Sequence, residues 1–273
     1  MAQASSVAER SICRQDGEYV VFAKHSIMGG SLGQEGSLAD RSNFQRVHEH
    51  IFFCDTGRIT ENVGFGPRNG GPVDEGVLFS YSQEAILSGR ESNGGRVDNF
   101  VPVDDEKYSS DIIRGILGEI SNSSANSCNV VPEGQYSQYN IITNNCQDFA
   151  ATVRRVYWQH MFSGTWIAEG YQCPFGAYHT EVISIQLNGS SLIATKLDSG
   201  GDRCVPTGSR TFTGLISNNI SKGDSFSITV VVGSPNAPAS GTALGQLTIV
   251  DANTLYLGSS TRDGITLRRD EGR

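Results

Sequence analysis

The sequence predicts an α+β domain followed by an all-β domain that forms a small barrel or sandwich. Amphipathic helical patterns occur only before Ser163, whereas about eight strand-like runs separated by turn signals follow it. The chain has 32 glycines, which favour short strands and frequent turns. We therefore expect a boundary at residue 163, with an N-terminal domain at 1–163 and a β-domain at 164–273.

The N-terminal domain is expected to combine strands with two main helices. The second strand is of special interest, because residues alternate between its faces. His48 and His50 share one face, and Val47 and Glu49 share the other. The predicted strands are Glu18–Ile27, Phe44–Phe53, Arg58–Gly64 and Val77–Tyr81, and the predicted helices are Ser109–Ile120 and Cys146–His160.

The β-domain is predicted from alternating patterns such as Ile183, Ile185 and Leu187, which indicate a half-buried sheet. The predicted strands are Trp166–Tyr171, Glu181–Leu187, Ser191–Lys196, Thr211–Ile216, Ser225–Val232, Gly245–Val250, Thr254–Leu257 and Ile265–Arg268.

Composition excludes several classes of partner. The net charge is -8 and no segment gathers Lys and Arg on one face, so nucleic acid is not expected. No apolar run is long enough for stable membrane insertion. Residues 1–14 lack the apolar core of a signal peptide, so we expect a cytoplasmic protein with thiols, and export by another route stays open. The six cysteines lack metal-finger spacing, and no metal or cofactor is expected.

Cys146 opens the second helix directly after Asn144 and Asn145. Either asparagine is a suitable N-cap, because its side chain can accept the free N–H groups of the first turn. The positive end of the helix dipole favours a thiolate, which is the nucleophilic form of cysteine. The alternative is a buried and inert helix cysteine.

A cysteine nucleophile needs a base, and histidine suits this role because its pKa lies near neutrality. Of the five histidines, His160 closes the Cys146 helix about four turns away, His179 belongs to the second domain, and His25 is expected to pack in the first strand. His48 and His50 are the candidates, on a strand of the same domain as Cys146.

This pattern resembles the circularly permuted papain-like group, which includes lecithin:retinol acyltransferase-like proteins and PPPDE-type isopeptidases. The resemblance rests on a histidine strand followed much later by Asn-Cys-x-x-Phe at a helix start, and it spans about residues 44–158. The matching residues are His50-Ile51-Phe52-Phe53, Asp55-Thr56-Gly57, Gly64-Phe65-Gly66-Pro67 and Asn144-Asn145-Cys146-Gln147-Asp148-Phe149.

The resemblance implies that Cys146 is the nucleophile and His50 the base. The third, orienting residue has no single match, and His48, Thr60 and Asn62 are all candidates. The backbone N–H of Cys146 would supply part of an oxyanion hole. Asp148 is expected to be structural, since it lies in the first helical turn.

The second domain is similar to the C-terminal β-barrel of certain F-box proteins and related plant chloroplast proteins, over about residues 166–212. That resemblance implies a ligand- or peptide-binding module without a catalytic residue. The sequence permits a disulfide between Cys173 and Cys204 in this domain but does not require one. The matching residues are Gly189, Leu192, Ala194-Thr195-Lys196, Gly201-Asp202, Val205-Pro206, Gly208 and Thr211-Phe212.

Two main functions follow from these patterns. The first is a cysteine hydrolase of peptidase, isopeptidase or amidase type, acting on a protein, peptide or small amide, with the β-domain binding substrate or partner. The second is a non-catalytic two-domain adaptor with a degenerate papain-like fold, for which an occluded Cys146 would be diagnostic. Acyltransferase or thioesterase chemistry, and a toxin or effector role, are further alternatives.

Overall fold

The computed structural model describes residues 7–26, 47–70, 73–89, 97–121, 134–140, 145–172, 177–216, 222–259 and 262–270. The chain divides into two compact units, Met1–Arg154 and Arg155–Arg273. The division falls inside helix α5 (Cys146–Phe162), whereas the boundary expected at residue 163 lies at the end of that helix.

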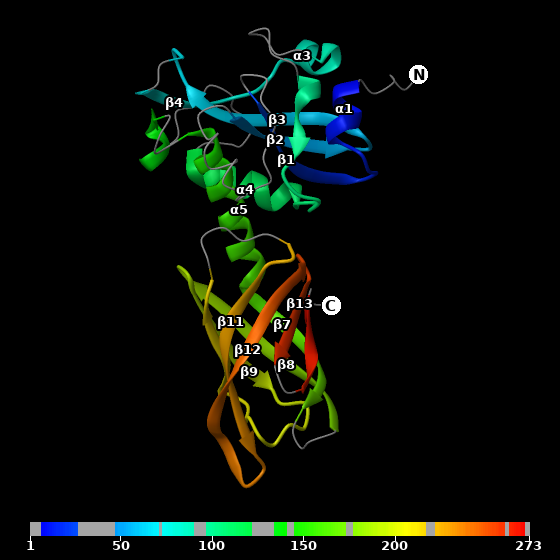
Figure 1. Ribbon diagram of the computed structural model, residues 1–273, viewed down its shortest axis with the longest axis vertical. Coiled ribbons are helices and arrows are strands. Elements are labelled where there is room, and N and C mark those ends of the chain that lie inside the picture. Colours follow the sequence, from blue (N-terminus) through cyan, green and yellow to red (C-terminus); the bar gives the residue numbers. More distant parts are fainter. Residues whose placement is uncertain are drawn as a thin grey trace. The chain divides into compact units, whose positions relative to one another are not determined.

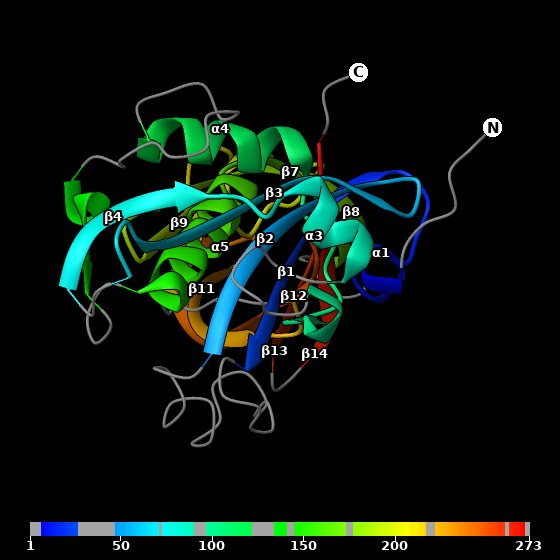
Figure 2. The ribbon, with the colours of Figure 1, turned by 90° about the horizontal axis from the view of Figure 1, so that it is seen from above.

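The first unit is built on a six-stranded sheet with the order β5-β1-β2-β3-β4-β6. The strands of each neighbouring pair in this order run antiparallel, and Figure 2 shows β1 to β4 side by side. The strands are β1 (Glu18–Ser26), β2 (Val47–Asp55), β3 (Arg58–Pro67), β4 (Val73–Phe79), β5 (Val101–Pro102) and β6 (Gln138–Asn140).

Helices cover both faces of this sheet (Figure 1). One face carries α1 (Val7–Ile12), α3 (Gln83–Ser88) and the 3₁₀ turn η1 (Val97–Asn99), and the other carries α4 (Ser110–Ser121) and the start of α5. A further 3₁₀ turn, η2, spans Gly134–Ser137. The α1–α3 side is packed by an apolar cluster that includes Val21, Ala23, Phe52, Tyr81 and Phe100.

Two short helices were not expected from the sequence, because six residues are too few to show helical periodicity. In α3 the local signals are clear in the structure. Ser82 caps the start by accepting the N–H of Ala85, and Gly89 ends the helix with φ 71°. The loop predicted at Met28–Arg41 lies outside the described residues.

A disulfide joins Cys13, just after α1, to Cys54 in β2, with 5.5 Å between their Cα atoms. The expectation of free thiols is therefore wrong for this pair. The fold brings the pair together because β2 places Cys54 on the face that α1 covers, within the same apolar cluster as Cys13. Cys204 is also disulfide-bonded, and Cys173, its predicted partner, lies outside the described residues.

The second unit contains a closed eight-stranded barrel with the order β10-β11-β12-β13-β14-β7-β8-β9. This confirms the predicted all-β domain and shows that, of the two expected forms, it is a barrel and not a sandwich. Each predicted strand has a counterpart with somewhat different ends. The strands are β7 (Gly164–Gln172), β8 (Ala177–Asn188), β9 (Ser191–Asp198), β10 (Arg210–Leu215), β11 (Ser225–Ser234), β12 (Ala237–Asp251), β13 (Thr254–Ser259) and β14 (Arg262–Arg269).

Alternate residues of the barrel strands form its core, as the period-2 pattern predicts. In β9, Leu192, Ala194 and Lys196 are buried while their neighbours are more exposed. The last turn of α5 is bonded to the barrel, because the indole N–H of Trp166 donates to the Phe162 carbonyl at 3.0 Å. Trp166 is thus a core anchor.

Candidate functional site

His50 is fully buried in an aromatic cluster on the α1–α3 face of the sheet. Its ring stacks on Tyr81 with centroids 4.4 Å apart, and His48 stacks on Phe79 at 5.5 Å. Gly64 of β3 lies directly opposite His50, so close that a Cβ there would be 2.2 Å from Nδ1. The imidazole thus fills a space that only glycine leaves open.

Both ring nitrogens of His50 have defined partners. Nε2 lies 2.8 Å from Oδ1 of Asn62, and Nδ1 lies 3.3 Å from Nε2 of His48. The same Asn62 oxygen accepts the N–H of Tyr81 at 2.6 Å, and the Asn62 amide donates to the Tyr81 carbonyl at 3.2 Å.

This arrangement assigns the tautomer of His50. The Asn62 oxygen is an acceptor, so Nε2 of His50 carries the proton, and Nδ1 accepts from His48 in the neutral ring. Of the three residues expected as orienting candidates, Asn62 contacts Nε2 of His50 and His48 contacts Nδ1. Thr60 instead donates to the Phe53 carbonyl at 3.3 Å.

The cluster disfavours imidazolium. Desolvation lowers the pKa of His50 from 6.5 to about 3, although its hydrogen bond to Asn62 acts in the opposite direction. Desolvation, with smaller contributions from His50 and His25, also holds the pKa of His48 well below its ordinary value. These rings are neutral near pH 7.

Cys146 begins α5, and its first turn is capped as the sequence predicts. Oδ1 of Asn145 accepts the N–H groups of Gln147 at 2.8 Å and Asp148 at 3.2 Å. In return, Oδ2 of Asp148 accepts the Asn145 N–H at 3.1 Å. This reciprocal capping box gives Asp148 a structural role, and the other cap candidate, Asn144, lies outside the described residues.

The Cys146 side chain is buried, with 4% of the residue exposed. Desolvation raises its pKa to about 12, despite hydrogen bonds from the backbone of Glu49, Gln147 and Cys146 itself, which favour the thiolate. The Glu49 carboxylate adds repulsion. Burial outweighs the helix N-terminus here, and the sulfur is a thiol at neutral pH.

Cys146 and His50 approach β2 from different sides. The α5 helix lies on the face of Glu49, because its Arg154 is bonded to the Glu49 carboxylate and lies over the Phe22 ring at 5.0 Å. His48 and His50 point to the other face, toward Phe79 and Tyr81. The structure therefore brings His48, His50 and Asn62 together, and it places Cys146 against the backbone of the intervening residue Glu49.

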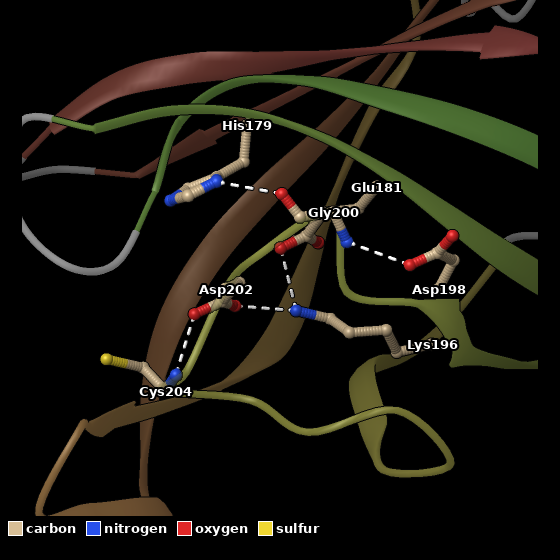
Figure 3. Close-up of polar contacts among 7 residues, drawn as sticks. All are labelled: His179, Glu181, Lys196, Asp198, Gly200, Asp202 and Cys204. Carbon is tan, nitrogen blue, oxygen red and sulfur yellow. Dashed lines mark hydrogen bonds and ion pairs between the residues drawn. The ribbon is translucent and has the colours of Figure 1, made fainter.

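A second polar cluster, which the sequence did not predict, lies inside the barrel (Figure 3). Nζ of Lys196 is 2.7 Å from Oε1 of Glu181 and 2.6 Å from Oδ2 of Asp202. Asp202 also accepts the Cys204 N–H at 2.7 Å on its other oxygen. The sequence did contain one sign of this cluster. Lys196 continues the inward-facing series of Leu192 and Ala194, and a buried cation requires buried partners.

The remaining histidines have other surroundings. His179 Nδ1 lies 3.1 Å from the Gly200 carbonyl oxygen, beside the lysine cluster (Figure 3), and His160 is exposed near the end of α5. His25 packs on Phe100 at 4.4 Å. Within the described ranges, no group of three or more His, Cys, Asp or Glu side chains is arranged to hold a metal ion.

Comparisons with known proteins assign no family. No protein-family model matches the chain, and no curated protein matches its sequence. None of the helices in the described part of the chain is long and apolar enough to cross a membrane.

Proposed function

We propose that this chain is a non-catalytic two-domain binding protein, with a degenerate permuted papain-like first domain. The observation that carries the proposal is the separation of the two key groups by the strand itself. Cys146 reaches β2 from the α5 face, whereas both ring nitrogens of His50 are engaged with His48 and Asn62 on the other face. A nucleophile and its base must lie within hydrogen-bond reach.

Protonation states support the same proposal. A catalytic cysteine needs a depressed thiol pKa or a base that receives its proton. Here burial raises the pKa of Cys146 to about 12 and lowers the pKa of His50 to about 3. Proton transfer from this thiol to this imidazole is therefore strongly unfavourable.

The test uses an electrophilic probe for cysteine hydrolases on the wild-type chain, Cys146→Ala and His50→Ala. We expect no labelling of Cys146 in the folded protein and labelling by iodoacetamide only after denaturation. Rapid labelling of folded wild type that both substitutions abolish would overturn the proposal. Circular dichroism of each variant separates loss of labelling from loss of folding.

A cysteine hydrolase is the second candidate, and one observation favours it. The backbone N–H groups of Glu49, Gln147 and Cys146 favour the Cys146 thiolate. His50 directly follows Glu49 in β2, and Asn62 orients its ring. In that case Cys146 would attack an amide or ester carbonyl of a protein, peptide or small amide, and acyl transfer to another acceptor would use the same groups. The probe experiment above decides between the two candidates.

The barrel is the unit we propose for partner binding. It exposes large apolar side chains on its outer surface, notably Leu215 at 71% and Leu244 at 78%. Such residues suit a protein or peptide partner better than a nucleic acid, in keeping with the net charge of -8.

The Cys13–Cys54 bond also bears on location. Disulfides persist in oxidising environments and are rare in the cytosol. We therefore propose an oxidising compartment in place of the cytoplasmic location expected from the sequence.

A further inference from the structure

We propose that Lys196, Asp202 and Glu181 form a self-modifying site, in which an isopeptide bond joins Nζ of Lys196 to Cγ of Asp202. Glu181 acts as the proton carrier. The three side chains have a geometry that suits this reaction, and no function assigned above uses them (Figure 3). The inference is independent of the role of Cys146.

Burial isolates the reacting groups from water. The Lys196 side chain is 1% exposed, and the Glu181 and Asp202 side chains are 5% and 4% exposed. The lysine enters from β9 between inward-facing apolar residues of the barrel, including Ala194. Exclusion of water keeps these groups in contact with one another and limits hydrolysis of the amide that they would form.

The nucleophile is already at its target. Nζ of Lys196 lies 2.6 Å from Oδ2 of Asp202, and Cγ is bonded to that oxygen. The amine is therefore in direct contact with the carboxyl group that it attacks, as a near-attack arrangement requires. Because the fold fixes both groups, the reaction is intramolecular and needs no encounter.

Asp202 is favoured as the acceptor because its other oxygen has a backbone donor. Oδ1 accepts the Cys204 N–H at 2.7 Å, in the position of an oxyanion-hole donor for a tetrahedral intermediate on Cγ. The Asp202 N–H donates to the Ser199 carbonyl at 2.8 Å. Hydrogen bonds of both the backbone and the side chain of Asp202 therefore fix the loop that carries the acceptor.

Glu181 is placed to move the protons. Its Oε1 is 2.7 Å from Nζ of Lys196, and its carboxyl also hydrogen-bonds with Asp202. Burial raises the pKa of Glu181 to about 7, even though Lys196 acts to lower it. A carboxyl with a pKa near neutrality both accepts and releases a proton, as general acid–base catalysis requires.

The step balances without an oxidant or a second reactant. Glu181 relays one proton from the Lys196 ammonium to Oδ2 of Asp202, and the neutral amine then attacks Cγ of the neutral carboxyl group to form the N–C bond. The Cγ–Oδ2 bond then breaks. Oδ2 leaves as water with two protons, both of which came from the ammonium. Glu181 carries these protons and ends in its initial protonation state. The product is one amide and one water.

The test is the mass of the intact, reduced and denatured full-length chain. We expect it to be lower than the sequence mass by one water. Trypsin should no longer cleave after Lys196, and fragmentation of the peptide should show a closed ring from Lys196 to Asp202. A ring closed at Glu181, or water loss at another site, would overturn the assignment.

Variants make the test specific. Lys196→Gln and Glu181→Gln should have their full sequence masses, whereas exposed Lys222→Gln should still lose one water. Asp202→Asn is the matched chemical control, because its amide can form the same bond by releasing ammonia instead of water. Its product should therefore have the same mass as modified wild type.

The outcome is decisive even where a substitution disturbs folding, because the wild-type mass is read first. A wild-type chain of full sequence mass, with the barrel folded by circular dichroism, would overturn the proposal. In that case the three residues form only a buried ion cluster.

Discussion

Nε2 of His50 lies 2.8 Å from Oδ1 of Asn62, and the same oxygen accepts the backbone N–H of Tyr81. One amide therefore joins β2, β3 and the segment after β4, and it fixes which nitrogen of His50 carries the proton. The lone pair left on Nδ1 is used by His48. This pairing explains why an imidazole is tolerated at a fully buried position.

Removal of the Asn62 amide should destabilise the fold. In Asn62→Ala, Nε2 of His50 and the N–H of Tyr81 lose a buried partner, and each unsatisfied group costs about 1–3 kcal/mol. Urea denaturation should therefore show a loss of about 3 kcal/mol. Thr60→Ala truncates an exposed side chain two residues away and should lower the free energy of unfolding by less than about 1 kcal/mol. Equal midpoints for the two variants would contradict the role given to Asn62.

Two glycines should respond to alanine in opposite directions. A Cβ at Gly64 would lie 2.2 Å from Nδ1 of His50, so Gly64→Ala must displace the ring and should cost about 1–3 kcal/mol. Gly115 lies on the exposed side of α4 with no atom within 4 Å of a Cβ, so Gly115→Ala should stabilise the helix by about 0.5–1 kcal/mol. Thermal denaturation of both variants is the measurement. Stabilisation by Gly64→Ala would refute the packing described around His50.

The Cys13–Cys54 bond should contribute measurably to stability. It closes a segment with a sequence separation of 41, for which loss of unfolded-state entropy predicts about 4 kcal/mol. The double variant Cys13→Ala/Cys54→Ala should lower the urea midpoint by a corresponding amount. Wild type in reductant is a less specific comparison, because Cys204 is also disulfide-bonded. Two free thiols at these positions in non-reducing peptide mapping would show that the bond is absent.

Acid should begin to destabilise the first unit at a pH above the range where carboxylates titrate. The folded-state pKa of His50 is about 3, below the ordinary 6.5, and the pKa of His48 is shifted in the same direction. Between pH 6.5 and pH 3 the unfolded chain therefore binds more protons than the folded chain. The contribution of His50 to stability is present above pH 6.5 and is lost as pH falls through this window.

One pKa unit corresponds to about 1.4 kcal/mol, so the loss for His50 reaches several kcal/mol at the acid end. The measurement is the free energy of unfolding between pH 7 and pH 4. His50→Gln should flatten this dependence, whereas Thr60→Ala, which removes no titratable group from an exposed position, should leave it unchanged. Glu181 contributes with the opposite sign, since its raised pKa favours the folded state at lower pH, so only differences between variants and wild type are diagnostic.

Much of the secondary structure was predictable because it depends on local periodicity. The helix expected at Ser109–Ile120 is α4 (Ser110–Ser121), and the alternation in Phe44–Phe53 correctly placed His48 and His50 on one face of β2. The eight barrel strands followed from the same period-2 signal. These features are determined by residues within a few positions of one another.

Features that depend on distant parts of the chain were not predictable in the same way. Periodicity places His50 on one face of its strand, but the face that receives α5 is determined by tertiary packing, including the Arg154–Glu49 pair. The Cys13–Cys54 bond likewise depends on where α1 packs. For Lys196, the inward position was readable, whereas its partners Glu181 and Asp202 became visible only with the barrel closed.

The closure of the barrel has a consequence for synthesis of the chain. The first barrel strand, β7, pairs with the last, β14, with Leu267 opposite Ala168. Until the ribosome has released β14, the β7 edge is unpaired, and an exposed strand edge is a template for association with other chains. Barrel closure therefore waits for the synthesis of β14 and depends on many long-range contacts, and a chain truncated before Arg262 would leave the β7 edge exposed.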